Sequence, residues 1–175
     1  MKKLIFAFII LSAVSCQKEK EKSGDTLNTT QKMNNSKAAE SWLVNAIETH
    51  FSDQTVEFEK SMAAITTPKY FEYKMDMMNV GLDTHGALSE DEFRNKWEKD
   101  FDLERVELNS GFLIGAQDWG KIKVTDIKLK EQTSESYIFQ VEISDVEFET
   151  KYPALIKVVN DGTAFKIADV QEVML

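Results

Sequence analysis

The chain has 175 residues, of which 42% are hydrophobic, and it carries a net charge of −9. That length suits one domain with a short extension, and the hydrophobic fraction is sufficient to form a core. An acidic protein repels phosphate backbones and anionic lipid headgroups, so the charge argues against nucleic-acid binding and against electrostatic docking on a membrane. Cys16 is the only cysteine, which excludes an intramolecular disulfide.

The N-terminus, MKKLIFAFIILSAVSC, has the features of a secretory signal peptide. Lys2 and Lys3 precede an apolar run over residues 4–11, which is shorter than the roughly 20 residues needed to cross a bilayer. We therefore expect residues 1–15 to be removed on export. Because both lysines leave with this segment and no acid does, the net charge would change from −9 to −11.

The small residues Ala-Val-Ser directly before Cys16 resemble the lipobox of bacterial lipoproteins, whose cysteine is diacylated and becomes the mature N-terminus. The resemblance makes Cys16 the candidate lipidation site, and several acyl chains would hold the protein stably in a membrane. Ordinary signal peptidase accepts the same small residues. The alternative is therefore a secreted protein with a free terminal thiol.

Residues 16–36 are predicted to form a lipidated cysteine followed by a flexible tether, because this stretch is polar and carries alternating charges. Its first part, QKEKEKSGD, resembles the Lys/Glu-rich export tags of Bacteroidetes lipoproteins. Those tags direct lipoproteins to the outer face of the outer membrane. The resemblance implies an outer-membrane lipoprotein exposed at the cell surface. If the stretch does not act as such a tag, the protein would stay on the periplasmic face of the outer membrane.

Residues 37–175 are predicted to form a single α+β domain, with helices first and strands after. Apolar residues at three- and four-residue spacing predict helices over residues 37–51 and 55–66. Thr67 followed by Pro68 is typical of a helix start. The third helix would place four large side chains on one core-packing face: Tyr70, Phe71, Met75 and Met78.

The segment GLDTHGALSEDEF, residues 81–93, has two interpretations. Its spacing partly fits an EF-hand loop with Asp83 and Glu92 as ligands, but Gly at the first position and His at the fifth leave too few oxygens for calcium. Alternatively, Ser89 and Glu92 form a capping box that begins a fourth helix. We expect the helix start, with a calcium site as the alternative.

After residue 111 the apolar period changes to two, which predicts strands. The predicted strands cover residues 112–114, 121–130, 136–150, 154–160 and 164–170. The alternation slips near Asp126 and Asp145, and such slips indicate β-bulges. The run NDGT after residue 159 predicts a hairpin turn.

Residues with catalytic chemistry are few. We expect His50 to pack beside the apolar face of the first helix and His85 to be solvated in its loop, while Cys16 is committed to the terminus. No nucleophile has a base partner and no zinc spacing occurs in the sequence, so we expect no catalytic residue, no metal and no cofactor. The strand acids are expected to face solvent, unless a bulge turns one inward as a general base: Asp126, Glu142, Asp145 and Glu147.

The turn Gln-Asp-Trp-Gly at residues 117–120 is the most distinctive local sequence. Asp118 and Trp119 are candidate ligand-binding residues at the rim of a pocket, since Trp offers a large flat surface for stacking. Alternatively, Trp119 packs on the sheet as part of the turn.

The order of elements and the closing run KVVNDGTAFKIADV resemble the nuclear transport factor 2-like superfamily. The runs TPKYFEYKMD, FRNKWEKDFD and GFLIGAQDWGKIKV also resemble an uncharacterised group of Bacteroidetes lipoproteins with that fold. The resemblance covers roughly residues 38–170. It implies a cystatin-like α+β cone, in which a strongly curved antiparallel sheet wraps around helices, and a homodimer through the sheet. The superfamily contains isomerases, dehydratases, polyketide cyclases and non-catalytic binding modules, so the resemblance does not select one function.

Two functions from different classes follow. The first is a lipid-anchored envelope protein with a non-catalytic domain that binds a small ligand or a protein partner. The alternative is a small-molecule enzyme of the isomerase or hydrolase type, which uses a carboxylate in the cone. A buried Asp or His beside open space would favour the enzyme, whereas a core filled by Met, Phe and Trp would favour the binding module. Calcium binding through residues 81–92 is a third hypothesis.

Overall fold

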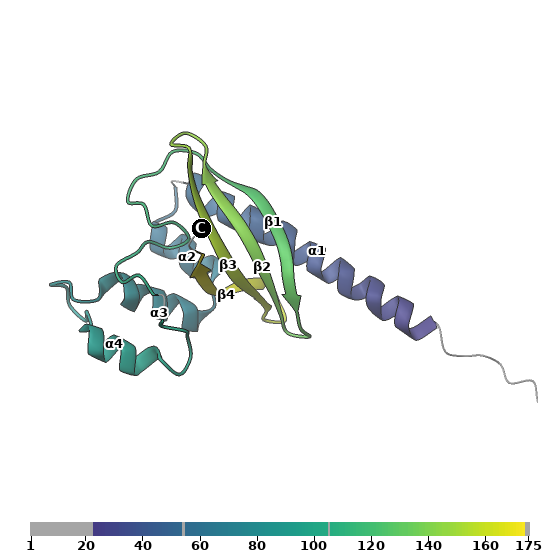
Figure 1. Cartoon of the computed structure of the whole chain (residues 1–175), viewed down its shortest axis with the longest axis horizontal. Coiled ribbons are helices and arrows are strands. Elements are labelled where there is room, and N and C mark those ends of the chain that lie inside the picture. Colours follow the sequence, from purple (N-terminus) through teal and green to yellow (C-terminus); the bar gives the residue numbers. More distant parts are fainter. Residues whose placement is uncertain (1–22, 54, 105, 174–175) are drawn as a thin grey trace, which may run out of the picture.

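The structure, a computed structural model, describes residues 23–53, 55–104 and 106–173. Figure 1 shows that helices come first along this part of the chain and a sheet follows, which confirms the predicted α+β class. The elements are α1 (Ser23–Ser52), α2 (Phe58–Ile65), α3 (Pro68–Asn79), α4 (Glu90–Trp97), β1 (Ile122–Gln132), β2 (Ser136–Asp145), β3 (Thr150–Asn160) and β4 (Phe165–Glu172).

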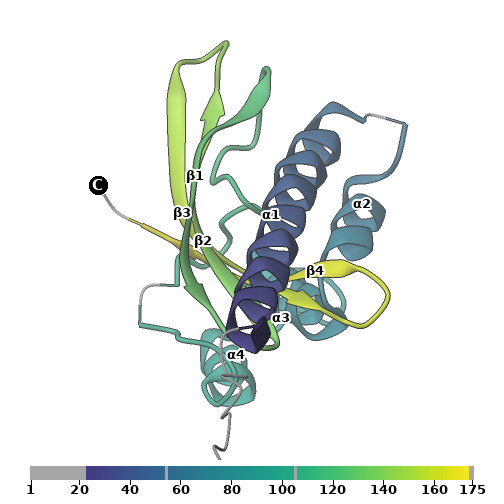
Figure 2. The same ribbon diagram turned by 90° about the vertical axis from the view of Figure 1, so that its right-hand side faces the viewer.

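The four strands form one antiparallel sheet in the order β1-β2-β3-β4, which is open at both edge strands. Figure 2 shows α1 against one face of the sheet, with α2 beyond it and α3 and α4 at one end. No described helix covers the opposite face of β1, β2 and β3. A register shift between Val124 and Asp126 confirms the predicted bulge in the first long strand, and a second shift follows between Leu129 and Glu131.

The inner face of the sheet is apolar because side chains alternate along each strand. On β2, four consecutive inward positions are each no more than 8% exposed: Tyr137, Phe139, Val141 and Ile143. The neighbouring positions of β3 contribute Ala154, Ile156 and Val158 to the same buried layer. This layer, together with the apolar faces of the helices, forms the core of the domain.

The prediction of one strand over residues 136–150 is wrong. Strand β2 ends at Asp145, and β3 pairs back from Thr150. Between them lies a turn in which Glu149 adopts a φ of 54°, a left-handed value that a strand does not accommodate. The slip in alternation near Asp145 therefore marks a hairpin turn instead of a bulge.

Helix α1 begins at Ser23, fourteen positions before the predicted start at residue 37. The predicted tether over residues 16–36 therefore overlaps the helix from Ser23 onward. The sequence between these positions contains no proline, the residue that breaks a helix most strongly. Farther along α1, Leu43 and Ile47 are fully buried, as the predicted apolar face requires.

The junction between α2 and α3 is fixed to the last strand. The Thr67 hydroxyl accepts a hydrogen bond from the Tyr70 backbone N–H at 3.2 Å, which confirms Thr67 as the cap of α3. The Thr67 backbone N–H in turn donates to the Ile167 carbonyl of β4 at 2.8 Å. The buried face of α3 differs from the predicted one, because it carries Tyr70, Tyr73, Lys74 and Met77, whereas Phe71, Met75 and Met78 are only half-buried.

Helix α4 begins as predicted. The Ser89 hydroxyl accepts from the Glu92 backbone N–H, and the Glu92 carboxylate accepts from the Ser89 backbone N–H at 2.9 Å, which completes a capping box. Phe93 and Trp97 on the inner face of α4 are buried. The Tyr73 ring on α3 lies edge-on to Trp97 at 5.6 Å and stacks on Phe101 at 4.0 Å. These rings join α3 and α4 into one cluster.

The predicted strand over residues 112–114 is wrong as well. This segment is a sequence of bends in which Leu113 has a φ of 68°. A Cβ on Gly111 would meet the Ile114 carbonyl oxygen at 2.5 Å, so the chain folds tightly back on itself. The apolar run enters the core through its side chains without pairing its backbone, since Phe112, Leu113 and Ile114 are each 1–3% exposed.

Among the residues that the structure describes, no helix combines the length and the apolar character needed to cross a membrane. The N-terminal part of α1 extends past the edge of the sheet at β1 (Figure 1).

Candidate functional site

The turn at residues 117–120 uses its tryptophan for packing. The Trp119 ring lies edge-on to Phe51 at 5.3 Å and tilted against Phe58 at 6.1 Å, so it links the end of α1 to the start of α2. Asp118 is exposed beside it. A recess of about 370 Å³ opens next to the turn, and its wall includes Gly120. A role for Asp118 and Trp119 in ligand binding stays a prediction.

Asp145 is the one strand acid that turns fully inward, with 1% of its surface exposed. Its carboxylate accepts hydrogen bonds from the backbone N–H groups of Gly120 at 2.6 Å, Glu147 at 3.0 Å and Phe148 at 3.1 Å. Burial favours a raised pKa for Asp145, but these bonds and one from the Lys121 backbone outweigh it and hold the pKa below its usual value. The carboxylate stays ionised, and its hydrogen bonds hold together the backbone around Gly120 and the turn that follows β2.

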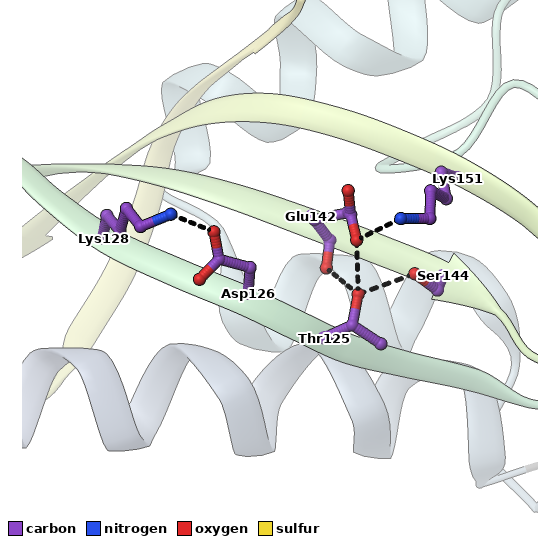
Figure 3. Close-up of polar contacts among 6 residues, drawn as sticks. All are labelled: Thr125, Asp126, Lys128, Glu142, Ser144 and Lys151. Atoms are coloured by element: carbon purple, nitrogen blue, oxygen red, sulfur yellow. Dashed lines mark hydrogen bonds and ion pairs between the residues drawn. The ribbon is translucent and has the colours of Figure 1, made fainter.

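The other strand acids face solvent, as expected. Figure 3 shows a polar cluster on the uncovered face of the sheet, with side chains from β1, β2 and β3. The Thr125 hydroxyl bonds to the Glu142 carboxylate at 3.0 Å and to the Ser144 hydroxyl at 2.7 Å, and Lys151 pairs with Glu142 at 2.9 Å. Two neighbours on β1, Asp126 and Lys128, form a separate exposed pair at 2.6 Å. Glu147 is exposed in the β2–β3 turn.

His50 is buried near the end of α1, as its position beside the apolar face predicted. Its ring lies among three phenylalanine rings at centroid distances of 4.6–5.2 Å: Phe51, Phe58 and Phe112. Nδ1 hydrogen bonds with the Ser61 hydroxyl at 2.8 Å, while Nε2 has no hydrogen-bonding partner among the described residues. Burial lowers the pKa of His50 to about 4, so the ring is neutral at physiological pH. His85 is exposed.

The most unusual buried group is Lys74, which lies on the core face of α3 between Tyr70 and Met77 with only 6% of its surface exposed. In the described part of the chain, its Nζ contacts the Met77 sulfur at 3.8 Å and forms no ion pair with a carboxylate. An ammonium group has three donors, and sulfur is a weak acceptor. Burial lowers the pKa of Lys74 to about 8, although Glu172 and Glu107 act in the opposite direction.

Lys74 lines a cavity of about 50 Å³ between α3, the loop after α4 and the end of β4. A buried water needs roughly 10–15 Å³ of such space, so the cavity has room for a few waters or a small organic molecule. Its wall also carries two tyrosines, Tyr70 and Tyr73, and four carboxylates, those of Asp102, Glu107, Asp169 and Glu172.

The carboxylates of the cavity differ in environment. Glu172 accepts from the Ser110 hydroxyl at 3.0 Å, and Asp169 accepts from Gln171 at 3.1 Å. Burial raises the pKa of Asp169, although the Gln171 bond opposes the shift. The pKa of both tyrosines is raised, first by burial and then by Asp169, so they remain protonated. The cavity therefore combines a weakly held amine with a carboxyl group that takes up a proton more readily than usual.

The sequence did not predict this cavity, because the spacing of Phe71, Met75 and Met78 indicated a different core face for α3. A signal was present. Lys74 stands four positions after Tyr70 and three before Met77, so it shares a helix face with two apolar residues. A lysine inside an apolar stripe of a helix is a candidate for burial.

The segment with calcium-loop spacing forms a turn. Gly81 and Gly86 adopt φ values of 69° and 85°, and the Gly81 N–H donates to the Leu88 carbonyl at 2.9 Å, which closes the turn before α4. The Glu92 carboxylate, the proposed last ligand, is engaged in the capping box. Within the described residues, no group of three or more potential metal ligands is assembled. Cys16, the candidate lipidation site, lies outside the described residues.

Comparison of this chain with protein families, with curated proteins and with solved structures finds no match.

Proposed function

We propose that this chain is a lipid-anchored envelope protein whose folded domain binds a small ligand or a protein partner without catalysing a reaction. The observation that carries the non-catalytic part is the filling of the space between the sheet and the helices. Large side chains that are at most 1% exposed occupy it: Tyr70, Phe93, Phe112 and Phe139. Two residues that the sequence offered as possible bases, His50 and Asp145, are engaged in packing and backbone contacts.

The anchor rests on the N-terminal sequence. A basic start, an apolar run and small residues lead to Cys16, and a polar charged stretch follows it. This arrangement supports a signal peptide over residues 1–15, lipidation of Cys16 and attachment to the outer membrane, at the cell surface if the Lys/Glu-rich stretch acts as an export tag. The N-terminal end of α1 would then connect the domain to the membrane anchor.

For the fold, we propose a cone of the nuclear transport factor 2-like kind. Support comes from the bulged antiparallel strands and from the packing of α1 on the inner face of the sheet. A homodimer through the uncovered face of the sheet belongs to the same proposal. That face carries both positive and negative side chains, for instance Lys128 beside Asp126. Two copies could therefore pair through it without like charges repelling each other across the whole interface.

A second candidate, a small-molecule enzyme, is favoured by one observation. The cavity beside α3 contains a carboxyl group with a raised pKa, Asp169, next to the poorly paired amine of Lys74. Perturbed ionisable groups in a cavity are typical of catalytic sites, although structural networks produce them too. The cavity volume of about 50 Å³ gives room for a few non-hydrogen atoms of a substrate.

The anchor is tested by changing Cys16→Ala in the full precursor and fractionating cells into soluble and membrane parts. We expect the wild type and a Ser12→Ala control in the outer membrane, and the Cys16→Ala protein released from it. Membrane association that survives Cys16→Ala would contradict the lipid anchor. Protease treatment of intact cells then distinguishes the outer face from the periplasmic face.

The non-catalytic role is tested by screening small polar compounds for a rise in melting temperature of the mature chain. Each compound that stabilises the chain is then incubated with it and recovered. We expect stabilising compounds to be recovered unchanged. Conversion of a stabilising compound to a product, lost in an Asp169→Asn variant, would establish the enzyme instead.

A further inference from the structure

The Nζ atom of Lys74 has a different environment from those of two neighbouring lysines, Lys69 on α3 and Lys96 on α4. Lys96 pairs with Glu72 at 2.7 Å and Asp76 at 2.8 Å, and Lys69 pairs with Asp100 at 2.5 Å. Both of these lysines are exposed. Lys74 is almost fully buried, has no ion-pair partner in the described residues, and lines the cavity.

A buried ammonium without a carboxylate in contact is costly, because its lost hydration is not replaced. Such a lysine releases its proton more readily and then presents a nucleophilic lone pair. A Met or Leu at this position would pack against Tyr70 and Met77 without that cost. The position therefore holds an amine where packing alone would favour an apolar side chain.

We propose that Lys74 is a carbonyl-reactive amine that binds a small neutral aldehyde or ketone in this cavity as an imine. The amine nitrogen bonds to the carbonyl carbon as the carbonyl π bond breaks, and a proton moves from nitrogen to oxygen to give a carbinolamine. The carbinolamine then loses its hydroxyl group as water, and a carbon–nitrogen double bond forms. One water is released, no electrons are gained or lost overall, and hydrolysis reverses the binding.

Two features of the cavity support this chemistry. The pKa of Lys74, about 8 against an ordinary 10.5, gives about 300-fold more free amine near pH 7 than an exposed lysine has. Dehydration of a carbinolamine needs a proton on the departing hydroxyl, and Asp169, whose pKa is raised, lines the same cavity. Asp169 would act as the proton donor.

The walls of the cavity select the ligand. Apart from Asp169, three carboxylates line it against one amine, so an anionic keto acid would meet repulsion that a neutral carbonyl compound does not: Asp102, Glu107 and Glu172. The volume of about 50 Å³ admits a molecule of a few non-hydrogen atoms. A short hydroxyaldehyde meets both conditions, since its hydroxyl can donate to a carboxylate.

This inference concerns the cavity alone and is independent of the lipid anchor, so the two proposals fail separately. To test it, the mature full-length chain is incubated with glycolaldehyde and a borohydride reductant near pH 7. Reduction turns an imine into a stable secondary amine, which peptide mass spectrometry locates. We expect Lys74 to be labelled first, at least about tenfold faster than Lys69 on the same helix.

Three controls define the outcome. Lys69→Met should retain the fast label and Lys74→Met should lose it, while circular dichroism shows that both variants are folded. Glyoxylate, an anion of similar size, should label Lys74 at least about tenfold more slowly than glycolaldehyde does. The rate at Lys74 should level off above about pH 8, whereas the rate at Lys69 continues to rise. Labelling of Lys74 no faster than that of Lys69 would overturn the proposal, and equal labelling by glyoxylate would overturn the neutral ligand class.

Discussion

The Asp145 carboxylate accepts a hydrogen bond of 2.6 Å from the backbone N–H of Gly120, which lies 25 positions earlier in the chain. The same carboxylate holds the turn between β2 and β3 through two further backbone N–H groups. One buried side chain therefore fixes the entry to β1 against the β2–β3 hairpin. It also positions Trp119, the residue before Gly120, against Phe51.

This contact leaves no space for a side chain at position 120. A Cβ on Gly120 would lie 2.7 Å from the Glu147 Cβ and 3.1 Å from the Asp145 carboxylate. We therefore expect Gly120→Ala to lower the free energy of unfolding by about 1–3 kcal/mol, measured by urea denaturation. Gly115→Ala is the control, because its Cβ would meet the Ser110 hydroxyl at an ordinary 3.6 Å. Equal urea midpoints for the two variants would contradict the close approach.

His50 makes stability depend on pH on the acid side. Its pKa is about 4 in the folded protein and about 6.5 when unfolded, so between these values the unfolded chain binds a proton that the folded protein does not. Stability should therefore decrease as pH falls from about 6.5 towards 4. We expect His50→Leu to flatten this part of the stability curve, measured by thermal unfolding at a series of pH values.

The matched control for His50 is His85→Leu, because His85 is exposed. It should leave the slope unchanged. If His50→Leu retains the wild-type slope between pH 6.5 and 4, then His50 is not buried in its neutral form.

Lys74 should destabilise the domain at neutral pH. Its folded pKa of about 8 lies below the ordinary 10.5, so the unfolded chain binds more protons between these values and stability rises with pH across that window. Measurements are best kept below about pH 9.5, before tyrosine ionisation contributes. We expect Lys74→Met to raise the free energy of unfolding at pH 7 by about 2–3 kcal/mol and to remove the rise above pH 8.

Lys69→Met serves as the control for Lys74, since Lys69 occupies the same helix in an exposed ion pair. It should change stability little, because such pairs contribute about 0–1 kcal/mol. A Lys74→Met variant less stable than Lys69→Met would show that the buried amine stabilises the fold.

The turn before α4 should respond to the loss of its cap and not to calcium. Ser89→Ala removes the hydroxyl that accepts from Glu92, and we expect a loss of about 1 kcal/mol by thermal unfolding. Ser134→Ala, in the exposed β1–β2 turn, should have no comparable effect. Calcium should leave the melting temperature of the wild type unchanged, and a calcium-dependent rise that Asp83→Asn abolishes would restore the metal site.

Local signals in the sequence predicted the local features well. The caps at Thr67 and Ser89 were predictable because each depends on residues within three positions. The turn at Asp161-Gly162 was predictable for the same reason, and the Asp161 carboxylate there accepts from the Ala164 N–H at 2.8 Å.

Features that depend on distant residues were not predictable. The apolar run at residues 112–114 indicated a strand, but all three of its side chains are buried in the core, which is formed by residues far away in the chain. Asp145 appeared as an outward acid because its hydrogen-bond donors lie across the sheet or around a turn. The cavity of Lys74 combines α3 with the end of β4, whose residues lie about a hundred positions later.

The connection between the α2–α3 junction and β4 also bears on when the chain can fold. Lys166 of β4 donates to the Ala64 carbonyl at 2.5 Å across 102 positions, and Thr67 bonds to Ile167 beside it. The first helices acquire these partners only once the final hairpin has formed. Folding is slow when such a long loop must close, because the chain loses conformational entropy before the long-range contacts form. An exported chain would thus complete its core only after its C-terminal end has crossed the membrane, and it would stay open to chaperones and proteases until then.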